Sequence, residues 1–448
     1  MKSLFRTYIS DLFFNRRWYT ALAGCSILFA LRFFLGSLGN LPYVFSGLVL
    51  LFFAMDYLFL FLPRRGLFAA RTHAERLSNG DENPIRIDIQ NFYEFQVRVE
   101  VIDEIPHQFQ RRDILFFAKL VAGGSRIIRY NLKPLKRGEY EFGSINVYAS
   151  SPIGMIKRRF RFDEQKIVPV YPSYQQMRRY QLLAIHDRLS EIGIKKTRRI
   201  GHSMEFEQIK EYVPGDDSRT LNWKATARRG QLMVNHYVEE KSQQVYCIID
   251  KGRVMKMPFD GLSLLDYAIN ASLLLSNVAL LKQDKAGIIT FSDQLGSVLM
   301  ASKKATQMQS ILELLYKQRT RYLESDFEKL YAHIRTRITQ RSLLVLFTNF
   351  ESIPGMQRQL PHLRKIARHH LLLVVFFENT ELRQLTEKEA KDVESVYVKT
   401  IGEKFSFEKK LIVKELEQYG ILTILTSPRN VTVASVNKYL ELKAKHAI

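Results

Sequence analysis

Two long apolar segments near the N-terminus, residues 18–38 and 41–62, constrain this chain more than any other feature of its sequence. Each is about as long as the ~20 residues that a helix needs to cross a hydrocarbon core. A short uncharged turn separates them. A cleaved signal peptide has a single, shorter apolar region, so it does not explain the pattern. We therefore expect an N-terminal pair of membrane-spanning helices.

Charged residues around these segments predict their orientation. Basic residues precede the first segment and follow the second: Lys2, Arg6, Arg16, Arg17, Arg64, Arg65 and Arg71. Because basic flanks stay on the cytoplasmic side, both ends of the pair are expected there. Arg32 and Asp56 interrupt the apolar segments. We expect them to snorkel or to pair with each other rather than to form an ion pathway.

Length, charge and cysteine content limit what the rest of the chain can be. A chain of 448 residues suits two or three domains. A formal net charge of +22 predicts an anionic neighbour, either phospholipid or nucleic acid. Two cysteines are too few for a disulfide framework or a cysteine zinc cluster. We divide the chain into a membrane anchor (1–71), a β-sandwich (72–175), a connecting segment (176–244) and an α/β domain (245–448).

Residues 72–175 alternate apolar and polar side chains with the period of a strand. Ile85, Ile87 and Ile89 would share one face of a strand, and turn sequences such as Asn79-Gly80 separate the runs. Short alternating strands between turns are typical of an antiparallel β-sandwich.

From residue 245 onward, short apolar runs alternate with amphipathic helical stripes. The predicted strands are residues 245–249, 286–291, 343–347, 371–377 and 421–425. This alternation predicts a doubly wound, largely parallel sheet with helices on both faces. The binding crevice of such a sheet lies at the carboxyl ends of its strands. The candidate residues there are Asp250, Ser292, Asp293, Thr348 and Asn349. No glycine-rich phosphate loop follows a strand, so nucleotide binding is not expected.

The connecting segment interleaves opposite charges around a turn and a tryptophan, and several interpretations stay open. Glu211, Asp216 and Asp217 could bind a cation; Glu205 and Glu207 could act as paired carboxylates; Arg219, Lys224, Arg228 and Arg229 could bind phosphate. Alternatively, the charges pair with one another and the segment packs against the sheet around Trp223. The basic run at residues 195–199 suits anionic lipid headgroups better than nucleic acid, because no reader module is evident.

The stretch from Glu211 to Arg228, Glu-Tyr-Val-Pro-Gly-Asp-Asp-Ser-Arg-Thr-Leu-Asn-Trp-Lys-Ala-Thr-Ala-Arg, closely resembles the signature of the bacterial domain of unknown function 58 family. Residues 64–67, 137–140, 151–154 and 436–440 resemble that family in the same order, so the resemblance covers nearly the whole chain. We assign the signature to partner binding through Glu211, Tyr212, Pro214, Gly215, Asp216, Asp217, Arg219, Asn222, Trp223, Lys224 and Arg228.

This resemblance implies a transmembrane helical hairpin, a β-sandwich and a von Willebrand factor A-like (Rossmann-like) domain. It also implies association with a MoxR-type AAA ATPase that assembles or matures client proteins. The location that follows is the bacterial inner membrane, with both termini and the soluble domains in the cytoplasm.

The same resemblance suggests where a divalent cation would bind. Von Willebrand factor A domains that hold a cation use Asp-x-Ser-x-Ser, a threonine from a later loop and a further aspartate. This chain has Asp250, Gly252 and Val254 in the first motif, Ser325 in place of the threonine and Asn349 in place of the aspartate. One carboxylate is a poor cage for a hard cation. We expect no tightly held Mg²⁺ and no other cofactor, although weak Mg²⁺ binding stays open.

These observations predict a non-enzymatic, membrane-anchored scaffold or adaptor that uses its α/β domain for protein–protein interaction, with no catalytic residues. One alternative is a hydrolase that uses the acidic signature cluster. Another is a basic surface that binds lipid or nucleic acid.

Overall fold

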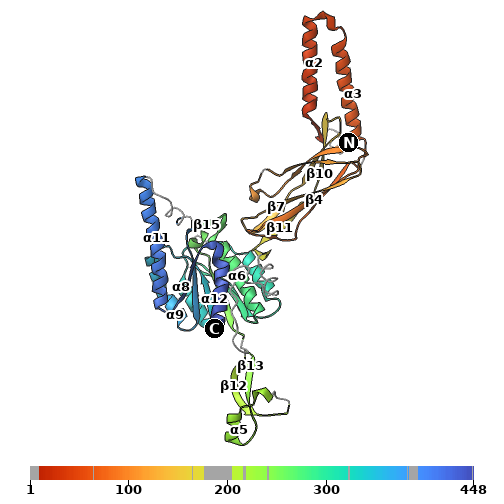
Figure 1. The fold of residues 1–448 in the computed structure, drawn as a ribbon. Coiled ribbons are helices and arrows are strands. Elements are labelled where there is room, and N and C mark those ends of the chain that lie inside the picture. Colours follow the sequence, from red (N-terminus) through yellow and green to blue (C-terminus); the bar gives the residue numbers. More distant parts are fainter. Residues whose placement is uncertain are drawn as a thin grey trace. The chain divides into compact units, whose positions relative to one another are not determined.

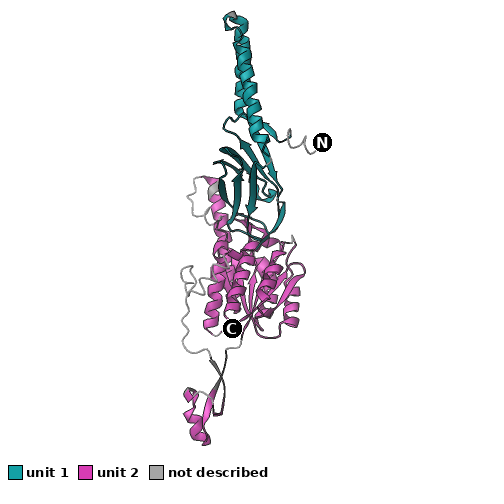
Figure 2. Cartoon of the chain, turned by 90° about the vertical axis from the view of Figure 1, so that its right-hand side faces the viewer, with its two compact units in different colours: residues 1–171 teal, residues 172–448 magenta. Residues whose placement is uncertain are grey.

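The protein folds into two compact units, residues 1–171 and 172–448 (Figure 2). The computed structural model describes residues 10–448 except 64, 112, 164, 176–203, 215–217, 240–241, 321–322, 381, 383–391, 446 and 448. Strands and helices occur in both units, so the predicted mixed α/β architecture is confirmed. The four-part division of the chain stays a prediction.

Two helices near the start of the first unit run antiparallel to each other (Figure 1): α2 (Arg16–Phe34) and α3 (Leu41–Phe61). Aromatic contacts join them at both ends, with ring centroids 5.3 Å apart for Phe29 and Tyr43 and 4.8 Å apart for Trp18 and Phe53. Together they hold α3 alongside α2.

Two of the described helices, α3 and α6 (Leu264–Leu281), are long and apolar enough to cross a membrane. Helix α6 is 78% buried within its unit, as expected for a core helix, whereas α3 is only 22% buried. Helix α2 does not meet the same criterion. The apolar helices therefore weakly suggest membrane association, and the first of the two predicted spans has no such support.

The predicted pairing of Arg32 with Asp56 is wrong. The Arg32 guanidinium lies 4.6 Å from the ring centroid of Tyr43, at the end of α3 opposite to Asp56. Asp56 is fully buried, and its Oδ2 accepts hydrogen bonds from the backbone amides of Met155 (2.7 Å) and Ile156 (3.0 Å). The carboxylate thus joins α3 to a loop of the β-sheet region, an arrangement that has no local sequence signal.

The carboxyl end of α3 is fixed in a similar way. Arg158 donates from Nη1 to the carbonyl oxygen of Leu60 at 2.6 Å, and the Tyr93 hydroxyl donates to the same oxygen at 2.8 Å. The last carbonyls of a helix have no partner within the helix, so these side chains satisfy a group that burial would otherwise leave unpaired. Asp56 and Arg158 together attach α3 to the sheets that follow through hydrogen bonds.

Three sheets make up the rest of the first unit. Their orders are β1-β10-β9-β5-β6, β2-β4-β7 and β3-β11-β8. The strands are β1 (Leu12–Phe14), β2 (Leu67–Thr72), β3 (Leu77–Ser78), β4 (Asn83–Asn91), β5 (Val97–Asp103), β6 (Leu115–Leu120), β7 (Ser125–Leu132), β8 (Gly138–Phe142), β9 (Ile145–Ser150), β10 (Ile156–Phe162) and β11 (Lys166–Tyr171). Buried side chains of β5, β9 and β10 pack with those of β2 and β4 in one core. Ile85, Ile87 and Ile89 are fully buried, which confirms the predicted alternation.

A six-stranded sheet of order β18-β17-β14-β19-β20-β21 forms the centre of the second unit. Its strands are β14 (Gln244–Asp250), β17 (Lys285–Phe291), β18 (Leu295–Ser302), β19 (Leu343–Phe347), β20 (Leu371–Phe377) and β21 (Leu422–Thr426). All are parallel except the edge strand β18, which pairs antiparallel with β17. The five parallel strands match the predicted ones. Strand β18 was not predicted: its apolar run, residues 298–301, is short, and its side chains are half-buried or exposed.

Helices cover both faces of this sheet (Figure 1). They are α6, α7 (Gln307–Tyr316), α8 (Phe327–Arg337), α9 (Ile353–Ala367), α11 (Val393–Gln418) and α12 (Val431–Ala444). Side-chain caps start several of them. Helix α6 begins with a capping box between Ser263 and Asp266, and α9 begins at Ser352, which accepts from the amide of Gly355. These side chains satisfy amide groups that have no partner within the helix.

The signature stretch lies between the two strands of an antiparallel hairpin, β12 (Met204–Glu211) and β13 (Met233–Glu239), and includes most of the short helix α5 (Trp223–Arg229) (Figure 1).

The Asp56 contacts lead to a stability prediction. Asp56→Ala should lower the free energy of unfolding by about 2–4 kcal/mol, because two buried amides lose their acceptor. Asp56→Asn keeps one acceptor oxygen and should fall between the wild type and Asp56→Ala. Thermal unfolding of the full chain in detergent measures the effect. Leu58→Ala, at a 54% exposed position of the same helix, is the matched control. Equal transition temperatures for Asp56→Ala and Leu58→Ala would contradict the assigned role.

Candidate functional site

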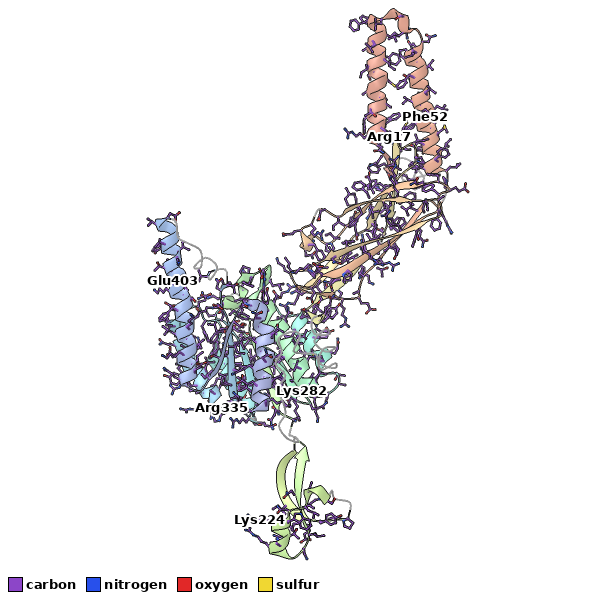
Figure 3. The ribbon with its side chains drawn as sticks, in the orientation of Figure 1. Arg17, Phe52, Lys224, Lys282, Arg335 and Glu403 are labelled. Atoms are coloured by element: carbon purple, nitrogen blue, oxygen red, sulfur yellow. The ribbon has the colours of Figure 1, made fainter. Side chains whose placement is uncertain are left out.

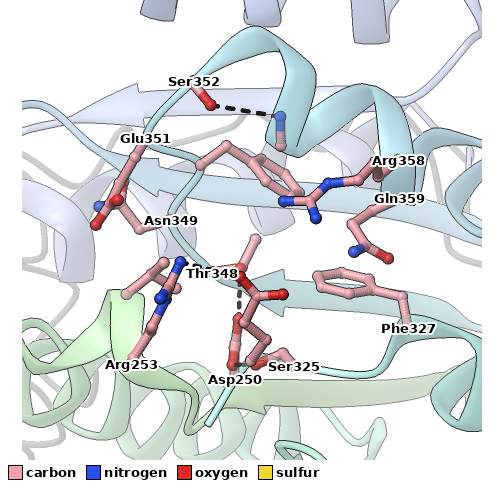
Figure 4. A pocket seen from close by; sticks show the side chains of 14 residues that line it. Asp250, Arg253, Ser325, Phe327, Thr348, Asn349, Glu351, Ser352, Arg358 and Gln359 are labelled. Carbon is pink, nitrogen blue, oxygen red and sulfur yellow. Dashed lines mark hydrogen bonds and ion pairs between the residues drawn. The ribbon is translucent and has the colours of Figure 1, made fainter. Parts of the chain in front are cut away.

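The carboxyl ends of β14 and β19 bring three of the predicted crevice residues together: Asp250, Thr348 and Asn349 (Figure 4). Ser292 and Asp293 follow β17 and do not line the same cavity. Asp250 is 1% exposed. Its Oδ1 accepts from the Gly252 amide at 2.8 Å and from the Ser325 hydroxyl, and its Oδ2 accepts from the Thr348 hydroxyl at 2.7 Å. Donors from its own loop and from two distant segments thus pair with both oxygens of one buried carboxylate.

Burial is the largest influence on the acidity of this group. Removal from water disfavours the charged form and raises the pKa of Asp250 above its ordinary value, although the hydrogen bonds from Ser325, Gly252 and Thr348 oppose the shift. The ionised carboxylate is therefore tolerated here because of its donors.

The absence of a side chain at position 252 is required by the packing. A Cβ atom on Gly252 would lie 2.1 Å from the Ser325 Oγ and 3.0 Å from the Asp250 Oδ1. The Ser325 hydroxyl therefore occupies the space that a serine at position 252 would need. The Ser325 hydroxyl can therefore reach Asp250 only because position 252 carries no side chain.

Asn349 is held by a cation from the protein itself. The ammonium group of Lys409, on α11, donates to the Asn349 Oδ1 at 2.8 Å and to the Phe377 carbonyl oxygen. Burial lowers the pKa of Lys409 to about 8. The sequence analysis did not identify Lys409, because nothing near it in the sequence indicates that α11 reaches the ends of β19 and β20.

These residues do not fit a hard divalent cation. Both oxygens of Asp250 already accept hydrogen bonds, position 252 supplies no oxygen, Val254 is apolar, and the Asn349 oxygen accepts from an ammonium group. Mg²⁺ needs near-octahedral oxygen donors, so it would have to displace this network. Within the described part of the chain, no group of three or more His, Cys, Asp or Glu side chains is placed to hold a metal ion.

A cavity of about 120 Å³ lies above Asp250. Arg253 pairs with Glu324 at 2.9 Å on its rim. Arg358, from the first turns of α9, points towards the cavity (Figure 4). Polar and charged side chains line the cavity together with Val254, Phe327 and Phe350.

The signature residues divide into structural and exposed positions. Asn222 caps α5, since its Oδ1 accepts from the Ala225 amide at 3.0 Å. Tyr212 directly follows β12, and its amide donates to the carbonyl oxygen of Leu232, just before β13, at 2.8 Å. Exposed positions are Glu211, Pro214, Trp223, Lys224 and Arg228. Trp223 is 69% exposed, so the predicted packing of the segment around it is wrong.

Several predicted residues lie outside the described part of the structure. They are Gly215, Asp216 and Asp217, together with the side chains of Glu205, Glu207 and Arg219. The cation, paired-carboxylate and phosphate interpretations depend on them and stay predictions.

Comparisons with known proteins agree with the resemblance noted from the signature. The family described as "Protein of unknown function DUF58" matches residues 208–406. The uncharacterised protein YeaD of Bacillus subtilis (strain 168) is 28% identical over 221 residues, which cover 47% of this chain and 52% of YeaD. The matched region therefore spans about half the length of this curated relative.

Two solved structures show weaker similarity. The conserved hypothetical protein BatB from Bacteroides thetaiotaomicron is 13% identical with a TM-score of 0.31, covering 46% of this chain and 100% of BatB. A PapD-like domain of human CEP192 is 13% identical with a TM-score of 0.18, covering 24% of this chain and 85% of that domain. Scores this low do not establish a shared fold.

The packing of Gly252 against Ser325 can be tested by a double-mutant cycle. Gly252→Ala should destabilise the protein by about 1–3 kcal/mol, because its methyl group overlaps the serine hydroxyl. Adding Ser325→Gly should recover part of that loss, so the two effects should differ from additivity by about 1 kcal/mol or more. Chemical denaturation of the four proteins measures the cycle. Simple additivity would show that the two positions do not share this space.

The raised pKa of Asp250 predicts a pH dependence of stability. Its folded pKa lies above the ordinary value of 3.8, so the folded state binds the proton more tightly and stability falls as pH rises from about 3.8 through the folded pKa. Asp250→Asn does not titrate and can keep all three hydrogen bonds, since its amide can donate to the Thr348 hydroxyl.

The stability advantage of Asp250→Asn over the wild type should therefore grow across that interval and stay constant above it. Denaturation curves at several pH values measure the difference. Glu328→Gln, at an exposed position of α8, is the control and should show no such trend. A constant difference for Asp250→Asn at all pH values would contradict the assignment.

Proposed function

We propose that this protein is a membrane-anchored, non-enzymatic scaffold that binds other proteins through the crevice of its α/β domain. The observation that carries this proposal is the state of Asp250. Its carboxylate is buried and already accepts three hydrogen bonds, so it is poorly placed to act as a base, a nucleophile or a metal ligand. A catalytic carboxylate needs access to the group with which it reacts.

The surroundings of Asp250 support recognition of a protein. Its cavity is lined by Arg253, Glu324, Glu351 and Arg358, which combine both signs of charge at the edge of the sheet. Patterned charges of this kind favour one partner over others and guide its orientation. We propose that the α/β domain is von Willebrand factor A-like and that its crevice binds partners without a metal ion.

The proposed partner is a MoxR-type AAA ATPase, which would supply energy for assembling or maturing client proteins. This assignment rests on the family resemblance of the signature stretch. The proposed location is the bacterial inner membrane, with α2 and α3 as the anchor and the other parts of the chain in the cytoplasm. Anionic headgroups would add a weaker contact with the basic surface.

Affinity purification of the full chain in mild detergent, after crosslinking in cells, tests the proposal. The wild type should recover a MoxR-type ATPase, and chelation of divalent cations should leave the recovery unchanged. Arg358→Glu should lower recovery about tenfold, as expected for loss of one interface hot spot.

Arg341→Glu makes the same change of charge just before β19, at the opposite edge of the sheet, and should have no effect. An equal loss of ATPase recovery with Arg358→Glu and Arg341→Glu would show that the partner responds to the net charge of the domain and not to the crevice. ATP or peptide hydrolysis by the purified chain, abolished by Asp250→Asn, would overturn the scaffold proposal.

A further inference from the structure

The helix of the signature stretch is too short to be stable by itself, and the structure holds it by side-chain contacts. Helix α5 has seven residues, whereas isolated helices need about 12–15 to persist in water. The Asn222 carbonyl oxygen accepts from both the amide and the hydroxyl of Thr226, each at 2.9 Å. Thr226 Oγ1 in turn accepts from the Met233 amide at 3.0 Å. Helix α5 is therefore fastened to β13.

Two further features complete this frame. The Asn222 side chain donates to the Asn235 Oδ1 at 2.8 Å, which makes a second link to β13. Gly230 ends the helix with a φ of 71°, a conformation that side chains rarely adopt. Met233 and Val234 are buried beneath this end of the hairpin. These residues fix the position of α5 without using its outer face.

The outer face carries the side chains that the frame does not need. Trp223 is 69% exposed, and Val213 and Leu232, at the same end of the hairpin, are 57% and 47% exposed. Lys224 and Arg228 are also exposed, and Figure 3 shows Lys224 on α5, away from the open ends of the two strands. We refer to Val213, Trp223, Lys224, Arg228 and Leu232 together as the α5 tip.

The placement of the two cations is unfavourable for the helix itself. Lys224 and Arg228 are four residues apart, so they are neighbours on the helix surface and repel each other. Lys224 also lies in the first turn, where the helix dipole favours an anion. Arg228 lies in the last turn, where the dipole favours it. Local conflicts of this kind, beside a large exposed aromatic ring, are expected where residues serve recognition.

We propose that the α5 tip is a docking surface for a partner protein that presents an apolar pocket to Trp223 and acidic side chains to Lys224 and Arg228. Tryptophan and arginine are the residue types most enriched among interface hot spots. This inference rests on the proposed scaffold function and assigns it a second surface, on a different part of the chain from the Asp250 crevice.

A protein fits this surface better than a lipid bilayer or a nucleic acid. Glu211 is exposed at the end of β12, two residues before Val213, so the same end of the hairpin presents a carboxylate beside its cations. A uniformly anionic surface would repel this carboxylate. A protein surface can match both signs of charge at once.

Photocrosslinking followed by a binding measurement tests the inference. A benzoylphenylalanine replaces Trp223 in the full chain, expressed in cells of its own bacterium. In a second strain it replaces Phe117, on β6, which is equally exposed at 69%. A protein that crosslinks from position 223 and not from position 117 is then purified, and its affinity for the full chain in detergent is measured.

We expect Trp223→Ala to weaken that affinity about 30-fold or more, the size of a hot-spot loss. Lys224→Glu combined with Arg228→Glu should weaken it further as salt is lowered, because an acidic partner is then repelled. Phe117→Ala is the control and should leave the affinity unchanged. Trp223 is exposed, so unaltered thermal unfolding of Trp223→Ala would show that the loss is not one of folding.

The inference would be overturned by an affinity unchanged by Trp223→Ala or by crosslinks from position 223 to lipid alone. Binding of the tip to phosphatidylserine vesicles or to oligodeoxythymidine that Trp223→Ala abolishes would also overturn it. Recovery of the ATPase by the full chain without any protein crosslink from position 223 would overturn this inference and leave the scaffold function standing. If neither recovery of the ATPase nor a protein crosslink from position 223 is observed, both the scaffold function and this inference are overturned.

Discussion

The buried carboxylate of Asp250 depends on donors from its own loop and from two distant segments. A carboxylate out of water is costly unless hydrogen bonds replace its hydration. Gly252, Ser325 and Thr348 supply them, and each must be in place for the others to fit. This requirement fixes the ends of β14 and β19 and the loop that carries Ser325. The shape of the crevice follows from one desolvated group.

The same principle operates in the first unit. Asp56 and Arg158 are both nearly inaccessible to water, and each bonds to backbone groups of a distant segment. In this way α3 is fastened to the sheet region by buried polar contacts as well as by apolar ones. A charged residue within an apolar helix, which at first suggests transport, here has a structural role.

The signature stretch illustrates how structural and recognition roles can be separated within a few residues. The side chains of Asn222 and Thr226 each form a hydrogen bond with a residue of β13. Trp223 and Lys224, which lie between them, are directed to solvent. The sequence pattern alone shows only that these four residues belong to one signature stretch. Only the hydrogen bonds show which of them support the helix and which are available to a partner.

Much of the fold could be predicted from local pattern. The parallel strands were visible as apolar runs, and the alternation of Ile85, Ile87 and Ile89 showed a strand with one buried face. The amphipathic stripes between these runs indicated helices. The edge strand β18 was missed because its side chains are only half-buried, and the predicted Arg32–Asp56 pair was wrong because contacts in space do not follow from separation in the sequence.

The sequence by itself determined the five parallel strands of the second unit and the helices between them, because hydrophobic periodicity acts over a few residues. It also placed Asp250 and Asn349 at the ends of strands. The tertiary structure decided what those residues do. The Ser325 hydroxyl fills the space beside Gly252, and Lys409 reaches Asn349 from α11. These contacts join residues 60 or more positions apart in the chain, and only the packing of helices on the sheet brings them within hydrogen-bonding distance.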